Sequence, residues 1–147
     1  MQLPNLPPRP IVYLAGPYTD EDSTVMQARM TLHQKTACAL AQRGMSVISP
    51  ISQWAPVAKF YMPEESESRN FWMEQDLPLL TKCDAMVLLP LFGWTESRGT
   101  GAEIAIAEAR HIPILVHEPK GEKLAGVGEH RKWAKLKFSP SSFYLEQ

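Results

Sequence analysis

The sequence lacks the features of several large classes of protein. No apolar run approaches the roughly 20 residues that a membrane-spanning helix needs. The formal net charge of −1 provides no basic field, so neither a membrane nor a nucleic-acid polymer is an expected partner. The two cysteines, Cys38 and Cys83, have no cysteine–histidine cluster around them, so we expect free, buried thiols and no metal site.

Common nucleotide-binding and hydrolytic motifs are also missing. The glycines near residue 100 match neither G-x-G-x-x-G nor a loop ending in Gly-Lys-Ser/Thr, so we expect no cofactor. None of the four histidines pairs with an evident Ser or Cys nucleophile, which argues against a catalytic triad. The proline-rich residues 1–8 lack the basic and apolar regions of a signal peptide, and we expect a cytoplasmic location.

The composition is that of a soluble globular protein. Of the 147 residues 44% are hydrophobic and 21% charged, which suits one domain with a real core. We expect an extended arm over residues 1–9 and a single domain over residues 10–147. Within it residues 118–147 form a C-terminal extension without a readable pattern, which is expected to cover an edge of the sheet or to contact a partner subunit.

Short apolar runs alternate with helical patterns along the chain. Strands are expected at residues 11–15, 45–49, 85–89 and 112–116, and helices at 22–43, from about 66–68 to 80, and at 103–110. Pro78 is expected to kink or divide the second helix, and residues 51–62 are expected to be irregular. Apolar strands that alternate with helices predict an α/β fold with a parallel sheet covered on both faces.

The expected loops place a pocket at one edge of this sheet. Residues 16–22, 49–62 and 91–100 follow the carboxyl ends of three strands, where ligands bind in open α/β sheets. The loops are rich in Gly, Pro, Ser and aromatic residues. We expect a pocket lined by Tyr13 or Tyr18, Trp54 and Ser97, with Glu103 at its base.

The segment Glu96-Ser97-Arg98-Gly99-Thr100-Gly101-Ala102-Glu103-Ile104 carries the strongest functional signal. A strand, a glycine-bearing turn and a helix N-terminus form an anion site, because the first N–H groups of a helix have no internal partner. The glycines are expected to serve a positive φ or close backbone approach. Glu103, expected in the first helical turn, would be held ionised by the positive helix end.

Each of these residues also has an ordinary structural interpretation. Glu103 can be an exposed acid that contributes a few tenths of a kcal/mol at a helix start. Asp76 can belong to a solvated helix face, and Asp84 can be a local cap. Residues 97–101 can form a plain turn and helix cap. The residue types alone leave these alternatives open.

Taken together, the ordered segments resemble the nucleoside 2-deoxyribosyltransferase superfamily. The matching pieces cover about residues 10–117 and are Val12-Tyr13-Leu14-Ala15-Gly16-Pro17-Tyr18, Glu74-Gln75-Asp76-Leu77, Cys83-Asp84-Ala85-Met86-Val87 and Ser97-Arg98-Gly99-Thr100-Gly101-Ala102-Glu103. The resemblance implies a flavodoxin-like (Rossmann-like) three-layer sandwich. It also implies a homodimer or higher homo-oligomer and a nucleoside or nucleoside 5′-monophosphate as partner. Residues 51–62 do not match the characterised enzymes and look closer to a bacterial and phage group of small relatives without assigned activity.

The resemblance also implies roles for individual residues. Glu103 would be the nucleophile that attacks C1′ of the sugar, Asp76 the second acid, and Tyr13 the residue that orients the nucleophile. The expected substrate-binding residues are Gly16, Pro17, Tyr18, Trp54, Ser97, Gly99, Thr100 and Gly101.

Ser97 distinguishes between branches of the superfamily. Transferases acting on free nucleosides have an aspartate six residues before the nucleophile, whereas this chain has Ser97. A hydroxyl removes like-charge repulsion toward a phosphate and adds a donor. The resemblance therefore implies hydrolysis of the N-glycosidic bond of a (deoxy)nucleoside 5′-monophosphate. The alternatives are sugar transfer between bases, a non-catalytic nucleotide-binding or sensor module, and an interaction protein that docks through residues 54–62.

Overall fold

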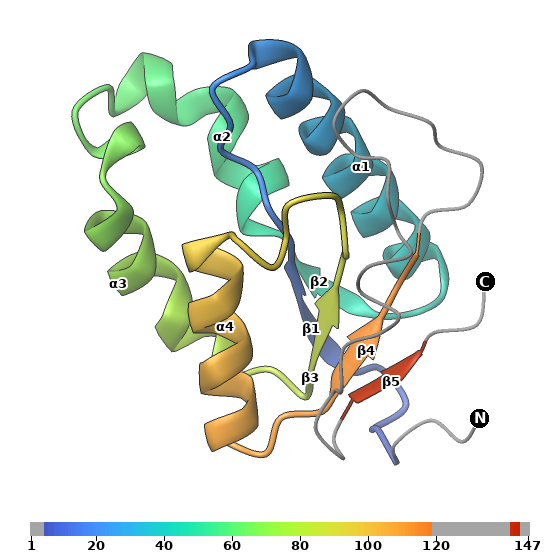
Figure 1. Ribbon diagram of the computed structural model, residues 1–147. Coiled ribbons are helices and arrows are strands. Elements are labelled where there is room, and N and C mark those ends of the chain that lie inside the picture. Colours follow the sequence, from blue (N-terminus) through green and yellow to red (C-terminus); the bar gives the residue numbers. More distant parts are fainter. Residues whose placement is uncertain (1–4, 119–141, 145–147) are drawn as a thin grey trace.

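The computed structural model describes residues 5–118 and 142–144, and its helices pack around a parallel sheet (Figure 1). The strands are β1 (Ile11–Ala15), β2 (Ser46–Ile48), β3 (Ala85–Leu88), β4 (Ile114–Val116) and β5 (Ser142–Tyr144). They pair in parallel in the order β2-β1-β3-β4-β5. This order is that of a flavodoxin-like sheet. The predicted fold class is confirmed.

Helices α1 (Ser23–Gln42) and α3 (Arg69–Leu80) begin at the capping residues that the sequence indicated. The other helices are α2 (Pro50–Tyr61), the short 3₁₀ helix η1 (Glu65–Glu67) and α4 (Arg98–Ala109). The side chains of Asp22, Ser68 and Ser97 accept backbone N–H groups at the starts of α1, α3 and α4. Gly44, with φ at 89°, follows the end of α1 as predicted.

The two faces of the sheet carry separate parts of the core. Successive side chains of a strand point to opposite faces. Val12 and Leu14 therefore pack with Leu32 of α1, among other residues, on one face. Tyr13 lies on the other face, in the cluster that includes Ala107 of α4. Helices therefore cover both faces of the sheet, as the apolar strands predicted.

The prediction that residues 51–62 are irregular is wrong. Residues 51–61 belong to helix α2. Pro50 occupies the first helical position, where its missing N–H costs nothing. Pro56 lies inside α2 and is tolerated because tertiary packing outweighs its local cost. Ala58 is buried, and Trp54 contacts Trp72 of α3. In α3, similarly, the helix continues past Pro78 to Leu80 rather than dividing.

Helix α4 begins at Arg98, five residues before the predicted start at Glu103. Gly99 and Gly101 therefore lie inside the helix, and neither has a positive φ. The expectation that these glycines serve a positive φ is wrong. Glu103 is likewise not in the first turn but is the sixth residue of α4.

Three further expectations concern the thiols, the membrane and the chain ends. Cys83 is buried but Cys38 is exposed, contrary to the prediction, and both are free. None of the helices in the described part of the chain is long and apolar enough to cross a membrane. Residues 142–144 add β5 to the β4 edge, while the rest of the extension from residue 119 and residues 1–4 lie outside the described ranges.

Candidate active site

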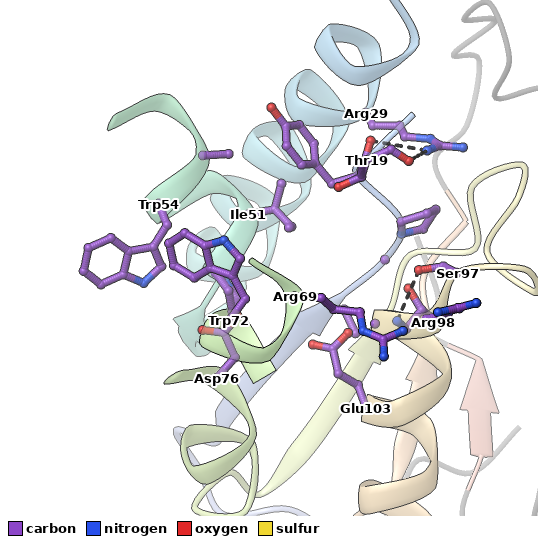
Figure 2. A pocket seen from close by; sticks show the side chains of 18 of the residues that line it. Thr19, Arg29, Ile51, Trp54, Arg69, Trp72, Asp76, Ser97, Arg98 and Glu103 are labelled. Atoms are coloured by element: carbon purple, nitrogen blue, oxygen red, sulfur yellow. Dashed lines mark hydrogen bonds between the residues drawn. The ribbon is translucent and has the colours of Figure 1, made fainter. Parts of the chain in front are cut away.

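A pocket of about 1030 Å³ lies where the carboxyl ends of β1, β2 and β3 meet. The loops after β1 and β3 line it, together with α2, α3 and the start of α4 (Figure 2). Ligand sites in open α/β sheets lie at this edge. The predicted location of the pocket thus agrees with the structure, although α2 replaces the expected loop at residues 51–62.

Glu103 lies in this pocket, where α4 presents it toward the sheet. Burial raises the pKa of its carboxyl from an ordinary 4.5 to about 8, with the charge of Asp76 adding to the rise and the Tyr13 hydroxyl opposing it. The expectation that the helix end holds Glu103 ionised is therefore wrong. Because α4 begins at Arg98, Glu103 lies beyond the first turn, where the helix dipole fades.

Tyr13 lies beneath the pocket, fully buried in β1. Burial and then the neighbouring Glu103 carboxylate raise the pKa of the Tyr13 hydroxyl, which is thus a neutral donor. The two groups interact, but their geometry in this structure falls short of a formed hydrogen bond. Tyr13 is therefore placed to orient Glu103 from below rather than to touch a ligand.

Asp76 faces the same pocket from α3. Its neighbours Glu74 and Gln75 are exposed, whereas Asp76 is half-buried and one of its carboxylate oxygens is enclosed without a hydrogen-bond partner among the described residues. Burial raises the pKa of Asp76 to about 6. Asp84, by contrast, accepts the Ile11 N–H at 2.8 Å and anchors the start of β1 outside the pocket.

The start of α4 forms one side of the pocket. Ser97 caps the helix by accepting the Thr100 N–H at 3.2 Å, and Ser97, Gly99 and Thr100 all line the cavity. A Cβ at Gly99 would meet open space, so neither packing nor a positive φ demands glycine there. Gly101 is exposed and does not line the pocket, unlike the other predicted ligand-binding residues of this segment.

The loop after β1 brings Gly16, Pro17 and Tyr18 to the opposite side. A Cβ at Gly16 would lie 2.9 Å from the Leu89 carbonyl oxygen, so only glycine fits this close approach. A ring nitrogen of His33, Nε2, lies 3.3 Å from the Pro17 carbonyl oxygen. Burial lowers the pKa of His33 to about 4, so its neutral form can donate there.

Arg29 is a positioning residue that sequence reasoning missed. Its guanidinium donates to the Thr19 carbonyl at 3.0 Å and to the Phe92 carbonyl at 2.8 Å, which ties the loops after β1 and β3 together. A usable signal was present: Arg29 lies on the same helical face as Val25 and Leu32, where a buried cation needs partners.

Aromatic rings form the wall of the pocket on the side of α2 and α3. The ring centroids of Trp54 and Trp72 lie 5.9 Å apart at an interplanar angle of 46°, and both residues line the pocket (Figure 2). Trp72 Nε1 donates to the Ser66 carbonyl at 2.9 Å, which fixes its ring. Sequence reasoning placed Trp54 here but assigned no site role to Trp72. It also assigned none to Arg69 or Arg98, which line the pocket as well.

Comparison with known proteins supports the fold and names a family. The structure is similar to that of a 2-deoxyribosyltransferase from the psychrotolerant bacterium Bacillus psychrosaccharolyticus, with a TM-score of 0.55 and 18% identity over 93% of this chain and 99% of that chain. At this identity the likeness establishes the fold alone. No curated protein matches the sequence. The model of a domain of unknown function, DUF1937, matches residues 10–119, and the chain therefore belongs to the DUF1937 family.

Proposed function

We propose that the protein hydrolyses the N-glycosidic bond of a nucleoside 5′-monophosphate and releases the free base and a sugar phosphate. The observation that carries this proposal is the pair Glu103 and Asp76. Two carboxyl groups from different helices face one pocket, close enough that the charge of Asp76 raises the pKa of Glu103. Retaining glycoside hydrolysis uses such a pair.

In the first step a Glu103 carboxylate oxygen attacks C1′ and forms an ester bond to the sugar. The bond from C1′ to the base nitrogen breaks, its electron pair leaves with the base, and Asp76 supplies the proton that the base takes up. In the second step Asp76 removes a proton from water, whose oxygen attacks C1′ and breaks the ester. Glu103 returns as a carboxylate and Asp76 as an acid, so the site is restored.

The pKa values of the empty site limit how much enzyme is in the reactive form. Glu103, with its pKa near 8, holds a proton more tightly than Asp76, with its pKa near 6. The reactive form needs the proton on Asp76 instead. Among molecules that carry a single proton on the pair, the reactive form is therefore the minor one. Positive charge that develops at C1′ favours ionised Glu103 and so favours the reactive form during the reaction.

The start of α4 supports a phosphorylated substrate. The N–H groups of Arg98 and Gly99 belong to the first helical turn, where no preceding carbonyl of the helix can accept them. Ser97 offers a hydroxyl at the same place, without the charge that an aspartate would bring against a phosphate. The substrate would thus lie with its phosphate on α4, C1′ over Glu103 and its base toward Trp54 and Trp72.

Transfer of the sugar to a second base is the other candidate function. The observation in its favour is the likeness of the fold to a 2-deoxyribosyltransferase. Both reactions share the glycosyl–Glu103 ester and differ only in whether water or a base attacks it. We also retain the homodimer or higher oligomer as a proposal, which light scattering in solution tests.

Base release from a panel of ribo- and deoxynucleoside 5′-monophosphates, followed by chromatography, tests the proposed function. We expect Glu103→Ala to abolish release. Glu108→Ala is the matched control, because Glu108 is an exposed acid on the same helix and does not line the pocket. Release that survives Glu103→Ala contradicts the mechanism, and binding of a nucleotide without release favours a sensor. A second free base added to the mixture distinguishes transfer from hydrolysis, and peptide mapping of the acid-quenched enzyme locates the ester on Glu103 or Asp76.

A further inference from the structure

Two arginines face the pocket without a part in the steps above. Arg69 is the first residue of α3, Arg98 is the first residue of α4, and both side chains line the cavity. Figure 2 shows Arg69 reaching across the pocket from the α3 side toward the first turn of α4, where Arg98 lies. The two cations thus come from separate helices to one region of the pocket.

Among the described residues, no acid that lines the pocket forms an ion pair with either of these cations. Asp20 lies 3.8 Å from Arg29, a different arginine. Glu67 and Glu96 also line the cavity, but within the described residues neither Arg69 nor Arg98 has an ion pair or a side-chain hydrogen bond. Both residues are partly open to solvent, so each guanidinium is available to an anion that enters the cavity.

Thr100 gives a second, independent indication of a ligand at this place. Only 1% of its surface is exposed, it lines the pocket, and its hydroxyl has no hydrogen-bond partner among the described residues. A buried hydroxyl without a hydrogen-bond partner destabilises the folded state. An oxygen-rich ligand at the start of α4 would remove this destabilisation, because its oxygens can accept the Thr100 hydroxyl and the free N–H groups of the first turn.

We infer that Arg69 and Arg98 clamp the phosphate group of the substrate from two sides, and that this clamp makes the site select phosphorylated over unphosphorylated nucleosides. The geometry of a guanidinium matches phosphate oxygens in paired, charge-assisted hydrogen bonds. Ser97, Thr100 and the first N–H groups of α4 complete the contacts. The nature of the rest of the ligand rests on the proposed function, whereas the clamp itself requires only an anion.

The clamp also connects binding to reaction. Helix α3 carries Arg69 and Asp76, while α4 carries Arg98 and Glu103. A phosphate held by both arginines fixes the two helix starts relative to each other, and with them the two carboxyl groups. Part of the phosphate binding energy would then be used to align the acids, so a substrate without phosphate should lose turnover as well as affinity.

The experiment compares the affinities of the full-length protein for a nucleoside 5′-monophosphate, the corresponding nucleoside and inorganic phosphate, by calorimetry. We expect Arg69→Gln and Arg98→Gln each to weaken nucleotide binding about tenfold or more, with nucleoside binding unchanged. Lys82→Gln and Arg110→Gln are the matched controls, because they remove one cation beyond the opposite ends of α3 and α4, outside the pocket. The controls should stay within about twofold of wild type, since exposed distant charges are screened. Thermal melts of all four variants exclude unfolding as the cause.

Two results would overturn the clamp. One is equal weakening of nucleotide and nucleoside by the arginine variants, and the other is no weakening beyond the controls. Failure of wild type to bind either nucleotide or phosphate overturns it as well. The proposed function fails separately: arginine-dependent binding without base release keeps the clamp and rejects the glycosidase. Base release that depends on Glu103 but not on either arginine keeps the glycosidase and rejects the clamp.

Discussion

The hydroxyl of Tyr13 and the carboxyl of Glu103 lie against each other at the base of the pocket, and each shifts the pKa of the other. Tyr13 comes from β1 and Glu103 from α4, so the contact links the centre of the sheet to the helix above it. Because the Tyr13 hydroxyl is neutral, it can donate its proton toward an ionised Glu103. It therefore favours the ionised carboxylate that a nucleophile requires.

Replacing Tyr13 with Phe should affect reaction more than folding. The lost hydroxyl has no well-formed hydrogen bond, so we expect the free energy of unfolding to change by less than about 1 kcal/mol. The pKa of Glu103 should rise further, because Tyr13 now lowers it, and the base-release rate should fall about tenfold. Tyr61→Phe is the control, since Tyr61 is 82% exposed and outside the pocket. An unchanged rate in Tyr13→Phe would leave Tyr13 a core residue only.

The rate of base release should follow a bell-shaped pH profile. Below about pH 6 both Asp76 and Glu103 hold protons, so no nucleophile remains, and above about pH 8 both are ionised, so no acid remains. The maximum should lie near pH 7, and kcat/KM should be followed, because it reports the pKa values of the free enzyme. Asp76→Asn should remove the alkaline limb of the bell, which reflects the loss of the acid. A profile that stays flat from pH 5 to 9 contradicts a role for this pair.

Glu103→Gln should stabilise the protein at alkaline pH while it abolishes base release. The pKa of Glu103 is higher in the folded state, about 8, than its ordinary value of 4.5, so the folded state holds the proton more tightly. Stability from this group is therefore full below about pH 4.5 and is lost as the pH rises to about 8. The variant should gain about 1–3 kcal/mol at pH 8 and little at pH 4.5, as denaturant unfolding would measure. Equal effects at both pH values would mean that Glu103 is not buried as described.

The sequence predicted the strands because the buried runs of a parallel sheet are almost wholly apolar. Residues 85–88, for example, are all buried, and only such a run survives coverage by helices on both faces. Helix α2 was missed because residues 51–62 were interpreted as irregular from the local sequence alone. Contacts that are distant in sequence, such as that between Trp54 and Trp72, decided its structure instead.

For the candidate site, too, the sequence predicted some properties, while others depend on tertiary contacts. Its position followed from strand ends and from the order of short segments, which are properties of the sequence itself. The electrostatics of Glu103 did not follow, because the predicted start of α4 was five residues late, and the acid expected in an exposed first turn is a half-buried residue of the second turn. Arg29 and Arg69 were missed because the carbonyl partners of Arg29, and the cavity that both residues line, form only once distant loops and helices come together.

Gly99→Ala and Gly101→Ala form a matched pair of variants. Both glycines lie early in α4, and a Cβ at either would meet open space. Alanine should therefore raise helix stability at both positions, by up to about 1 kcal/mol. Only Gly99 lines the pocket, so only Gly99→Ala should weaken nucleotide binding, by about tenfold if a phosphate contacts the backbone there. Equal affinities of the two variants in calorimetry would place the phosphate elsewhere.

Trp54→Leu should weaken binding through the base rather than through the phosphate. Trp54 and Trp72 together offer an aromatic wall to the pocket, and stacking of a base on an aromatic ring is worth about 1–3 kcal/mol. We therefore expect affinities for the nucleotide and the nucleoside to fall together, while binding of inorganic phosphate stays unchanged. Phe60→Leu is the matched control on the same helix, because Phe60 is 70% exposed and does not line the pocket. If Phe60→Leu weakens binding as much as Trp54→Leu, the aromatic residues of α2 act as an outer surface and not as a base platform.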